Sequence, residues 1–236
     1  MISRKDTPLT TSRDFCVIAA GCTGLIGNEL IKQLLDQDPV TRIYALSRRE
    51  LPFFHSKLNV IQHPQLRVQQ WQEDDPRPEY GFICLGTTLK QAGSKQALEK
   101  VDFELVCEVA QEMKLLGVKR LAVVSSYGAS TRSLSHYLRC KGRMELAIER
   151  LDFETVVFAR PGPLKGLREK PRRDESVVQA IATLFRPIMI GPLANLLPID
   201  ATDVALAMQY QLFGPSNRSH CVLNARAMRA LLAQYR

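Results

Sequence analysis

The sequence of 236 residues lacks the patterns of several protein classes. No apolar run approaches the roughly 18 residues of a membrane-spanning helix, and the first residues lack the apolar segment of a secretory signal peptide. Internal repeats and low-complexity tracts are also missing, which excludes repeat architectures. From these absences we expect one ordinary globular domain, without a membrane span and in the cytoplasm.

Cysteine and histidine show no spacing typical of a metal site or a disulfide framework. The six cysteines include no Cys-x-x-Cys pair, and most of them lie in apolar segments. We expect them to be reduced core residues. The four histidines have no metal-ligand spacing, so we expect no bound metal.

The chain has a surplus of positive charge. Its formal net charge is +8 and its isoelectric point is near 9.3. Such a charge suits nucleic acid, an anionic substrate or a phosphorylated cofactor. No helix-turn-helix pattern or aromatic-studded basic strand is present, so we expect no nucleic-acid partner. The basic cluster between Arg160 and Arg173 either binds an anionic substrate or is a solvated surface.

Apolar segments alternate with longer amphipathic ones, which predicts a doubly wound parallel sheet with helices on both faces. The expected strands are 15–20, Arg42–Ser47, Leu58–Ile61, Gly81–Gly86, Arg120–Ser125 and Glu154–Ala159, and the expected helices are Leu25–Leu35, Lys95–Leu116 and Leu134–Arg150. The final third is less regular, with expected helices at Val177–Phe185, Ala201–Leu212 and Ala225–Tyr235 and a strand at His220–Leu223. We expect residues 160–236 to form a small substrate-side lobe of a single domain.

Three glycines, Gly21, Gly24 and Gly27, follow the first expected strand and open the first helix. The first glycine permits a tight turn, the second lets the backbone approach a pyrophosphate, and the third lets helix and strand pack closely. The helix N-terminus then presents free amides and a partial positive charge to the anion. This arrangement predicts a dinucleotide-binding Rossmann fold, and the alternative is a purely structural turn.

The end of the second strand indicates which dinucleotide is bound. An NAD site usually carries Asp or Glu there, but this chain has Ser47, Arg48 and Arg49. Guanidinium groups suit a 2′-phosphate, so the sequence favours NADP(H) over NAD(H). Alternatively, both arginines are solvated, or Glu50 pairs with one of them.

A second glycine turn, Gly86-Thr87-Thr88, follows the fourth expected strand. The glycine would let the backbone pass close to the adenine ribose and the pyrophosphate, and the threonines could donate hydroxyls. We therefore include Gly86 and Thr87 in the candidate cofactor site.

Tyr137 and Lys141 stand four residues apart in an expected helix, so their side chains share one face. A tyrosine hydroxyl can exchange a proton with a carbonyl or alcohol oxygen, although its unperturbed pKa is about 10. A neighbouring ammonium favours the phenolate, and it can also bind ribose hydroxyls. Ser125 or Ser126, at the end of the preceding strand, could polarise the substrate oxygen. The alternative is a chance pair of residues beside an ordinary strand end.

Taken together, these motifs resemble the short-chain dehydrogenase/reductase superfamily, in particular its extended or atypical members. They are similar to the group that includes the Tat-interacting-protein oxidoreductase and bacterial epimerase-like relatives. The stretches that carry the resemblance are the glycine turn, Ser47-Arg48-Arg49, Cys84-Leu85-Gly86-Thr87-Thr88, Val101-Asp102, Ser125-Ser126-x-Gly128-Ala129, Tyr137-x-x-x-Lys141-Gly142 and Phe158-x-Arg160-Pro161-Gly162. They span about residues 15–165.

The resemblance implies a role for each matching residue. The pyrophosphate would be held by Cys22, Thr23, Gly24, Leu25, Ile26 and Gly27, the 2′-phosphate by Arg48, and the adenosine side by Leu85 and Gly86. Tyr137 would be the acid/base and Lys141 the ribose ligand, and the segment from Pro161 to Leu164 would pass beside the nicotinamide. Ser126 lies eleven residues before Tyr137, a slightly shorter spacing than in many members, so Ser125 remains an alternative.

Three functions remain open from the sequence. The first is an NADP(H)-dependent oxidoreductase acting on a carbonyl or alcohol substrate. The second is a non-catalytic NADPH-binding regulator, and the third is a sugar-nucleotide epimerase or dehydratase that retains NAD. The oligomeric state is open too, because a helix pair could form a homodimer face.

Overall fold

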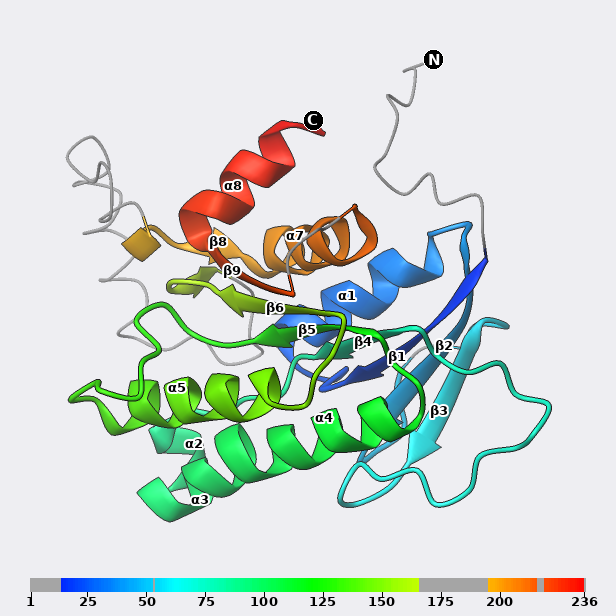
Figure 1. Ribbon diagram of the computed structural model, residues 1–236, viewed down its shortest axis with the longest axis horizontal. Helices are drawn as coiled ribbons and strands as arrows, with labels where there is room; N and C mark the ends of the chain where they lie inside the picture. Colours follow the sequence, from blue (N-terminus) through cyan, green and yellow to red (C-terminus); the bar gives the residue numbers. More distant parts are fainter. Residues whose placement is uncertain (1–13, 53, 166–194, 216–218, 236) are drawn as a thin grey trace.

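A seven-stranded parallel sheet forms the centre of the computed structural model, which describes residues 14–52, 54–165, 195–215 and 219–235 (Figure 1). The strand order is β3-β2-β1-β4-β5-β6-β9, and every pairing in it is parallel. The strands are β1 (Phe15–Ala20), β2 (Val40–Ser47), β3 (Leu58–Gln62), β4 (Tyr80–Ile83), β5 (Arg120–Val124), β6 (Thr155–Arg160) and β9 (His220–Asn224). The predicted doubly wound sheet is confirmed.

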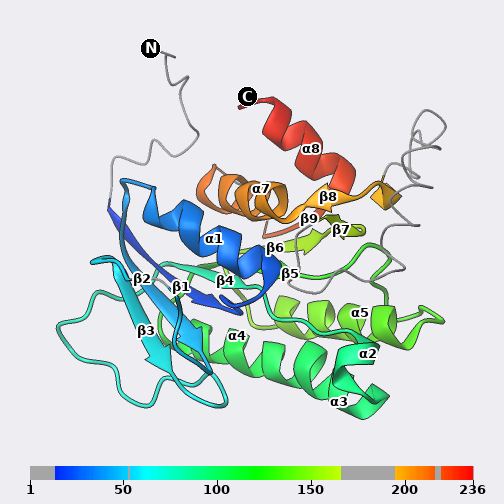
Figure 2. The same cartoon turned by 180° about the vertical axis from the view of Figure 1, so that it is seen from behind.

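Helices cover both faces of this sheet (Figures 1 and 2). One layer contains α1 (Leu25–Leu35), α7 (Ala201–Phe213) and α8 (Ala225–Ala233). The opposite layer contains α4 (Val106–Leu115) and α5 (His136–Glu149), with the short helices α2 (Leu89–Ala92) and α3 (Lys95–Glu99) beside them. Two short strands, β7 (Leu164–Lys165) and β8 (Ile199–Asp200), pair separately. The helix expected at Val177–Phe185 and most of the basic cluster lie outside the described residues.

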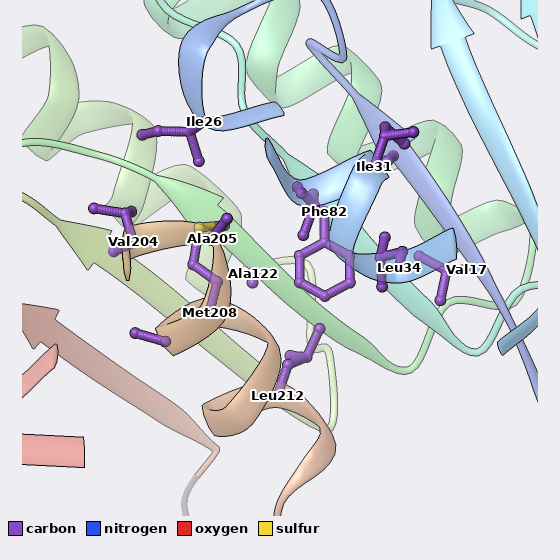
Figure 3. Close-up of a cluster of buried hydrophobic side chains, with 14 of the residues drawn as sticks. Val17, Ile26, Ile31, Leu34, Phe82, Ala122, Val204, Ala205, Met208 and Leu212 are labelled. Atoms are coloured by element: carbon purple, nitrogen blue, oxygen red, sulfur yellow. The ribbon is translucent and has the colours of Figure 1, made fainter. Parts of the chain in front are cut away.

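The central strand β1 is apolar and buried along its whole length because both faces of a parallel sheet are covered, whereas the edge strands β3 and β9 carry polar residues. In β1, Val17 packs in the core on the side of α1 and α7, whereas Ile18 packs in the core on the side of α4 and α5. Figure 3 shows part of the first core, where Leu34 of α1, Phe82 of β4 and Leu212 of α7 lie close together. This packing fixes α1, and therefore the turn that precedes it, against the sheet.

The long helix expected at Lys95–Leu116 is present as a continuous helical segment from Lys95 to Leu115, but its middle turn is π-helical. The chain forms α3, then a π-helical segment η1 (Lys100–Leu105), then α4. The wider π turn carries Asp102, which is buried although charged. Segments of this kind often occur at functional sites, where they redirect a side chain.

The strand order places β1 and β4 side by side at the centre of the sheet. The chain winds outward from β1 to β3 in one direction and from β4 to β6 in the other. Ligands of open α/β sheets bind at such a switch point, beyond the carboxyl ends of the strands. The loops that follow β1 and β4 therefore mark where a ligand would bind.

Candidate functional site

The glycine turn after β1 leaves no room for side chains at two of its three glycines. Gly21 has a φ of +84°, and a Cβ there would lie 2.6 Å from the carbonyl carbon and oxygen of Cys84. A Cβ on Gly27 would lie 2.1 Å from the Gly21 oxygen, whereas one on Gly24 would lie 3.3 Å from the same atom. The turn is therefore packed backbone to backbone, as a close cradle for a ligand requires.

Helix α1 begins directly after this turn and is open to an anion. Its N-cap residue Gly24 offers no side-chain hydrogen bond, and its first turn has no acidic residue. The first amides of a helix have no partner within the helix, and the helix dipole adds a partial positive charge there. These amides can therefore serve as donors to a phosphate group.

A cleft of about 220 Å³ opens beside the start of α1. It is formed at the carboxyl ends of β1, β4, β5 and β6, with α5 on one side. The residues predicted from sequence that line this cleft are Gly24, Leu25, Ile26, Leu85, Gly86, Thr87, Ser125, Ser126, Tyr137, Lys141, Pro161 and Leu164. The structure thus brings together side chains that are more than a hundred residues apart in sequence.

A smaller hollow of about 30 Å³ lies at the end of β2. It is lined by Gly21, Cys22 and Thr23 together with Arg48 and Arg49, and none of its lining residues is acidic. The hydroxyl of Ser47 donates to the Arg49 oxygen at 2.6 Å, which fixes the backbone at the arginines. No ion pair joins Glu50 to either arginine within the described ranges. The hollow is consequently positive and suits a phosphate.

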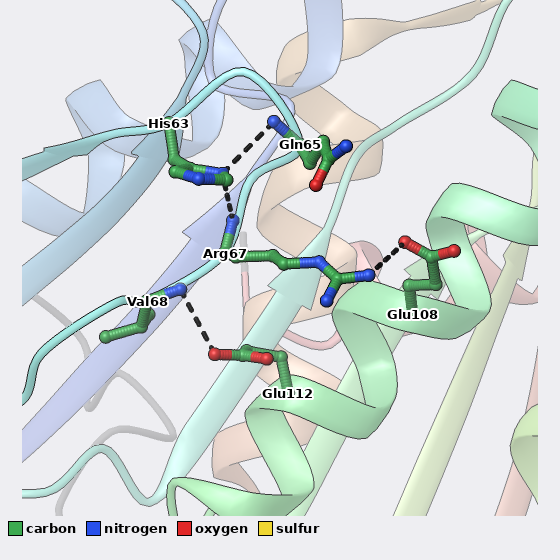
Figure 4. Close-up of polar contacts among 6 residues, drawn as sticks. All are labelled: His63, Gln65, Arg67, Val68, Glu108 and Glu112. Atoms are coloured by element: carbon green, nitrogen blue, oxygen red, sulfur yellow. Dashed lines mark hydrogen bonds and ion pairs between the residues drawn. The ribbon is translucent and has the colours of Figure 1, made fainter.

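Leu66 also lines this hollow, on a turn that is fastened to α4 (Figure 4). Its φ of +57° is unusual for a branched side chain. The His63 Nδ1 atom accepts hydrogen bonds from the amides of Gln65 and Arg67, both at 3.2 Å, and the amide of Val68 donates to Glu112 on α4 at 3.1 Å. This network holds the buried side chain of Leu66, in a strained backbone conformation, beside Arg48 and Arg49. An apolar side chain at this position is suited to packing against the face of a nucleotide base.

Lys141 is held by a buried carboxylate. Its Nζ atom lies 2.8 Å from Oδ1 of Asp102, and their side chains are 1% and 0% exposed. Lys141 also donates to the Val124 oxygen at 3.3 Å. The other carboxylate oxygen of Asp102 accepts the Thr87 amide at 2.8 Å. Asp102 thus connects α5 to the loop after β4.

Helix α5 approaches the cleft because Gly142 lets it pack against the loop after β5. A Cβ at this position would lie 2.3 Å from the carbonyl carbon of Ser130. On the cleft-facing side of α5, Tyr137 and Lys141 line the cleft together with both candidate serines. Ser125 is buried, and its Oγ atom has no hydrogen-bond partner among the described residues. A buried hydroxyl without a partner is suited to bonding a ligand.

Two thiols beside the glycine turn are kept uncharged. Burial raises the pKa of Cys22 to about 12, and burial likewise raises the pKa of Cys84 far above its usual value. Near neutrality these thiols therefore add no negative charge where a phosphate would bind, and they are poor nucleophiles. All six cysteines of the chain are free, and three of them are buried.

The sequence reasoning assigned no role to Asp102 or Leu66, although both lie at the site. A usable signal existed for Asp102, since it stands on the same helical face as Leu98 and Leu105, where an acidic residue is unusual. Leu66 gave no signal, because its role depends on a turn conformation that the sequence pattern does not specify. Gly27 lines neither cavity and instead permits the packing of α1 on the turn.

The sheet order and the glycine turn define a Rossmann-type α/β protein. Comparison with solved structures agrees. MoeE5, solved in complex with UDP-glucose and NAD, aligns with a TM-score of 0.63 at 16% identity, covering 93% of this chain and 80% of that one. UDP-glucuronic acid 4-epimerase from Bacillus cereus, solved with NAD, gives a TM-score of 0.62 at 13% identity, covering 89% of this chain and 78% of that one. These likenesses establish the fold.

Sequence relatives identify the family, in agreement with the resemblance described above. The HIM1 family model matches residues 82–190. Protein fmp52, mitochondrial, from Emericella nidulans is 34% identical over 174 residues, covering 70% of this chain and 74% of that protein. Protein HTATIP2 from Rattus norvegicus is 31% identical over 179 residues, covering 72% and 74%. The chain belongs to this HIM1 family of HTATIP2-like proteins.

The expected cytoplasmic location is contradicted by the same comparisons. The fungal relatives, including Protein FMP52 from Saccharomyces cerevisiae at 30% identity, are named as mitochondrial proteins. The prediction relied on a pattern that is typical of secretory signals, whereas mitochondrial targeting depends on a different, amphipathic pattern. Within the described ranges, no helix has the length and apolarity needed to cross a bilayer.

Proposed function

We propose that this chain is an NADP(H)-dependent oxidoreductase that interconverts a carbonyl compound and an alcohol. One observation carries the proposal: the cleft beside the glycine turn is also lined by Ser125, Tyr137 and Lys141. These are the groups that a short-chain dehydrogenase needs next to its cofactor. The turn fits a dinucleotide because a Cβ at Gly21 or Gly27 would overlap backbone atoms and displace the cradle.

The proposed cofactor site extends over both cavities. The amides at the start of α1 would bind the pyrophosphate, with Thr23 and Cys22 beside it. Arg48 and Arg49 would bind the 2′-phosphate in the smaller hollow. Leu66 and Leu85 would pack against the adenosine half. Pro161 and Leu164 would lie beside the nicotinamide, and Lys141 would donate to the hydroxyls of its ribose.

The reacting groups then have separate tasks. A nicotinamide dinucleotide held in the cleft would supply or accept the hydride. Tyr137 would give a proton to the oxygen of a carbonyl substrate, or remove one from an alcohol. We assign the oxygen-binding hydroxyl to Ser125 ahead of Ser126, because the Oγ of Ser125 is buried in the cleft wall without a partner in the described structure.

The preference for NADP(H) rests on the charge of the smaller hollow. Two guanidinium groups lie at the position where an NAD site usually presents a carboxylate. A 2′-phosphate would form charge-assisted bonds there, whereas a 2′-hydroxyl would gain less. The net positive charge of the chain also suits an anionic substrate.

The proposed activity is tested with a panel of aldehydes, ketones and quinones and with NADPH as reductant. We expect NADPH consumption that Tyr137→Phe reduces by at least about 100-fold, since a positioned acid typically contributes 10²–10⁴-fold. The variant should retain the NADPH affinity of the wild type. Tyr127→Phe, which removes the same hydroxyl outside the lining of the cleft, is the matched control.

Turnover that survives unchanged in Tyr137→Phe would remove this residue from the mechanism. Micromolar NADPH binding without turnover on any substrate would instead favour the non-catalytic regulator. An epimerase that retains NAD is the remaining alternative, supported by the likeness to MoeE5 and UDP-glucuronic acid 4-epimerase. It predicts NAD in the purified protein, and the absence of bound NAD would count against it.

A further inference from the structure

The carboxylate of Asp102 has no place in the proposed chemistry, although it is fully buried against Lys141, which lines the cleft. Its Oδ1 atom lies 2.8 Å from the Nζ atom of Lys141, and neither side chain is more than 1% exposed. An ammonium group has three N–H donors. The contact with Asp102 is an ion pair by distance, since Oδ1 accepts no hydrogen bond within the described structure, whereas one N–H donates to the Val124 oxygen at 3.3 Å. An N–H of the ammonium therefore remains for a group in the cleft, which Lys141 lines.

The same carboxylate also fixes the opposite wall. Its Oδ2 atom accepts the amide of Thr87 at 2.8 Å, in the loop that follows β4. Gly86 lies directly over the ion pair, since a Cβ there would be 3.4 Å from Oδ1 of Asp102 and 3.7 Å from Nζ of Lys141. Both walls of the cleft are therefore set by one side chain, which the π turn of η1 carries.

A buried ion pair is not in itself a source of stability. Removing two charges from water is costly, and an apolar pair of similar size is often as stable or more so. Lys141 lines the ligand cleft and Asp102 lies behind it, which suggests a different role for the carboxylate, the fixing of a charged donor in one orientation. The contacts of the Lys141 ammonium with Asp102 and with the Val124 oxygen would fix its orientation.

We propose that Asp102 is a positioning residue that directs the Lys141 ammonium toward the ribose of the bound dinucleotide. This inference rests on the proposed function, because it presupposes a dinucleotide in the cleft. Charge compensation alone makes the opposite prediction. If Asp102 only offset a positive charge, its removal would leave the cleft more positive and would tighten the binding of an anionic cofactor.

The test is a double-mutant cycle on NADPH affinity, measured by isothermal titration calorimetry. The variants are Asp102→Asn, Lys141→Met and the two combined. We expect each single variant to bind NADPH about tenfold or more weakly, which corresponds to the loss of one charge-assisted hydrogen bond. The double variant should bind no more weakly than Lys141→Met, because the two residues act as a unit. Glu104→Gln, the same charge change on an exposed residue of η1, should bind like the wild type.

Asp102→Glu provides a second variant in case Asp102→Asn does not fold. This variant keeps the negative charge but displaces it by one methylene. If Asp102 positions Lys141, NADPH should bind more weakly. If Asp102 only compensates charge, the NADPH affinity should not change. Denaturant unfolding of each variant, run in parallel, separates a general loss of structure from an effect on the ligand.

Three results would overturn the inference. They are unchanged or tighter NADPH binding by Asp102→Asn, losses in the double variant that equal the sum of the single ones, and wild-type affinity in Asp102→Glu. A wild-type protein that binds no nicotinamide dinucleotide would overturn the proposed function and this inference together. A wild type that binds NADPH, with additive losses in the cycle, would overturn the role of Asp102 alone.

Discussion

Replacement of Gly27 by alanine sets two opposing effects against each other in helix α1. Alanine is the better helix former by about 1 kcal/mol. Against this, its Cβ would lie 2.1 Å from the Gly21 oxygen and 2.8 Å from the Gly21 carbonyl carbon. Both are backbone atoms of the turn, so the overlap cannot be relieved by rotating a side chain.

We expect the steric cost to exceed the gain in helix propensity. Overpacking typically costs about 1–3 kcal/mol, and contact with backbone belongs at the upper end of that range. The net loss in the free energy of unfolding should therefore be about 2 kcal/mol. In a domain of this size such a loss lowers the Tm by roughly 4–8 °C. The displaced turn should also bind NADPH at least about tenfold more weakly, because its amides no longer converge.

Gly214→Ala supplies the matched control. Its Cβ would lie 2.7 Å from the Tyr210 oxygen at the end of α7, outside the lining of either cavity. This variant should lose stability but retain NADPH affinity, as measured by denaturant unfolding and calorimetry. A Gly27→Ala protein that is more stable than the wild type by about 1 kcal/mol, with unchanged affinity, would refute the reasoning.

Two further predictions concern Arg48 and Cys22, which both line the smaller hollow. Arg48→Ala should weaken NADPH binding by about 10–100-fold, because a charged hydrogen bond to the 2′-phosphate is lost, and should leave NADH binding nearly unchanged. Equal losses of affinity for both cofactors in calorimetry would contradict the assignment of Arg48 to the 2′-phosphate. Burial raises the pKa of Cys22 from 9.0 to about 12, so the unfolded chain releases this proton first as the pH rises. The contribution of the buried Cys22 thiol to the free energy of unfolding is thus fully present below about pH 9. It is lost between pH 9 and 12, at no more than about 1.4 kcal/mol per pH unit for one thiol. In Cys22→Ala the free energy of unfolding should therefore decrease less steeply between pH 8 and 10 than in the wild type. An identical decrease in both proteins would contradict the raised pKa of Cys22.

Local patterns predicted much of the fold because they are set by short-range packing. The bounds of α1 match the predicted helix Leu25–Leu35, β5 ends one residue before its predicted strand, and β6 is shifted by one residue at both ends. Apolar periodicity identifies these elements because each buries one face or stripe. The π turn at Lys100–Leu105 was not predictable in this way, because the spacing of apolar residues in this segment is also compatible with an uninterrupted α-helix.

Contacts between distant segments are the part that the sequence did not provide. The glycine turn and the pair Tyr137 and Lys141 could be proposed from spacing alone, and the structure places them in one cleft. The buried pairing of Asp102 with Lys141 depends instead on how η1 packs against α5. Leu66 reaches the smaller hollow through a backbone conformation that is rare for leucine. Neither follows from a motif.

The most direct test of the account is calorimetric titration of the purified wild-type protein with NADPH, NADP, NADH and NAD. We predict saturable one-to-one binding of NADPH and NADP, with NADH and NAD at least about tenfold weaker because they lack the phosphate that Arg48 and Arg49 would hold. Absence of binding by all four dinucleotides would contradict the central claim that the turn at Gly21, Gly24 and Gly27 holds a pyrophosphate.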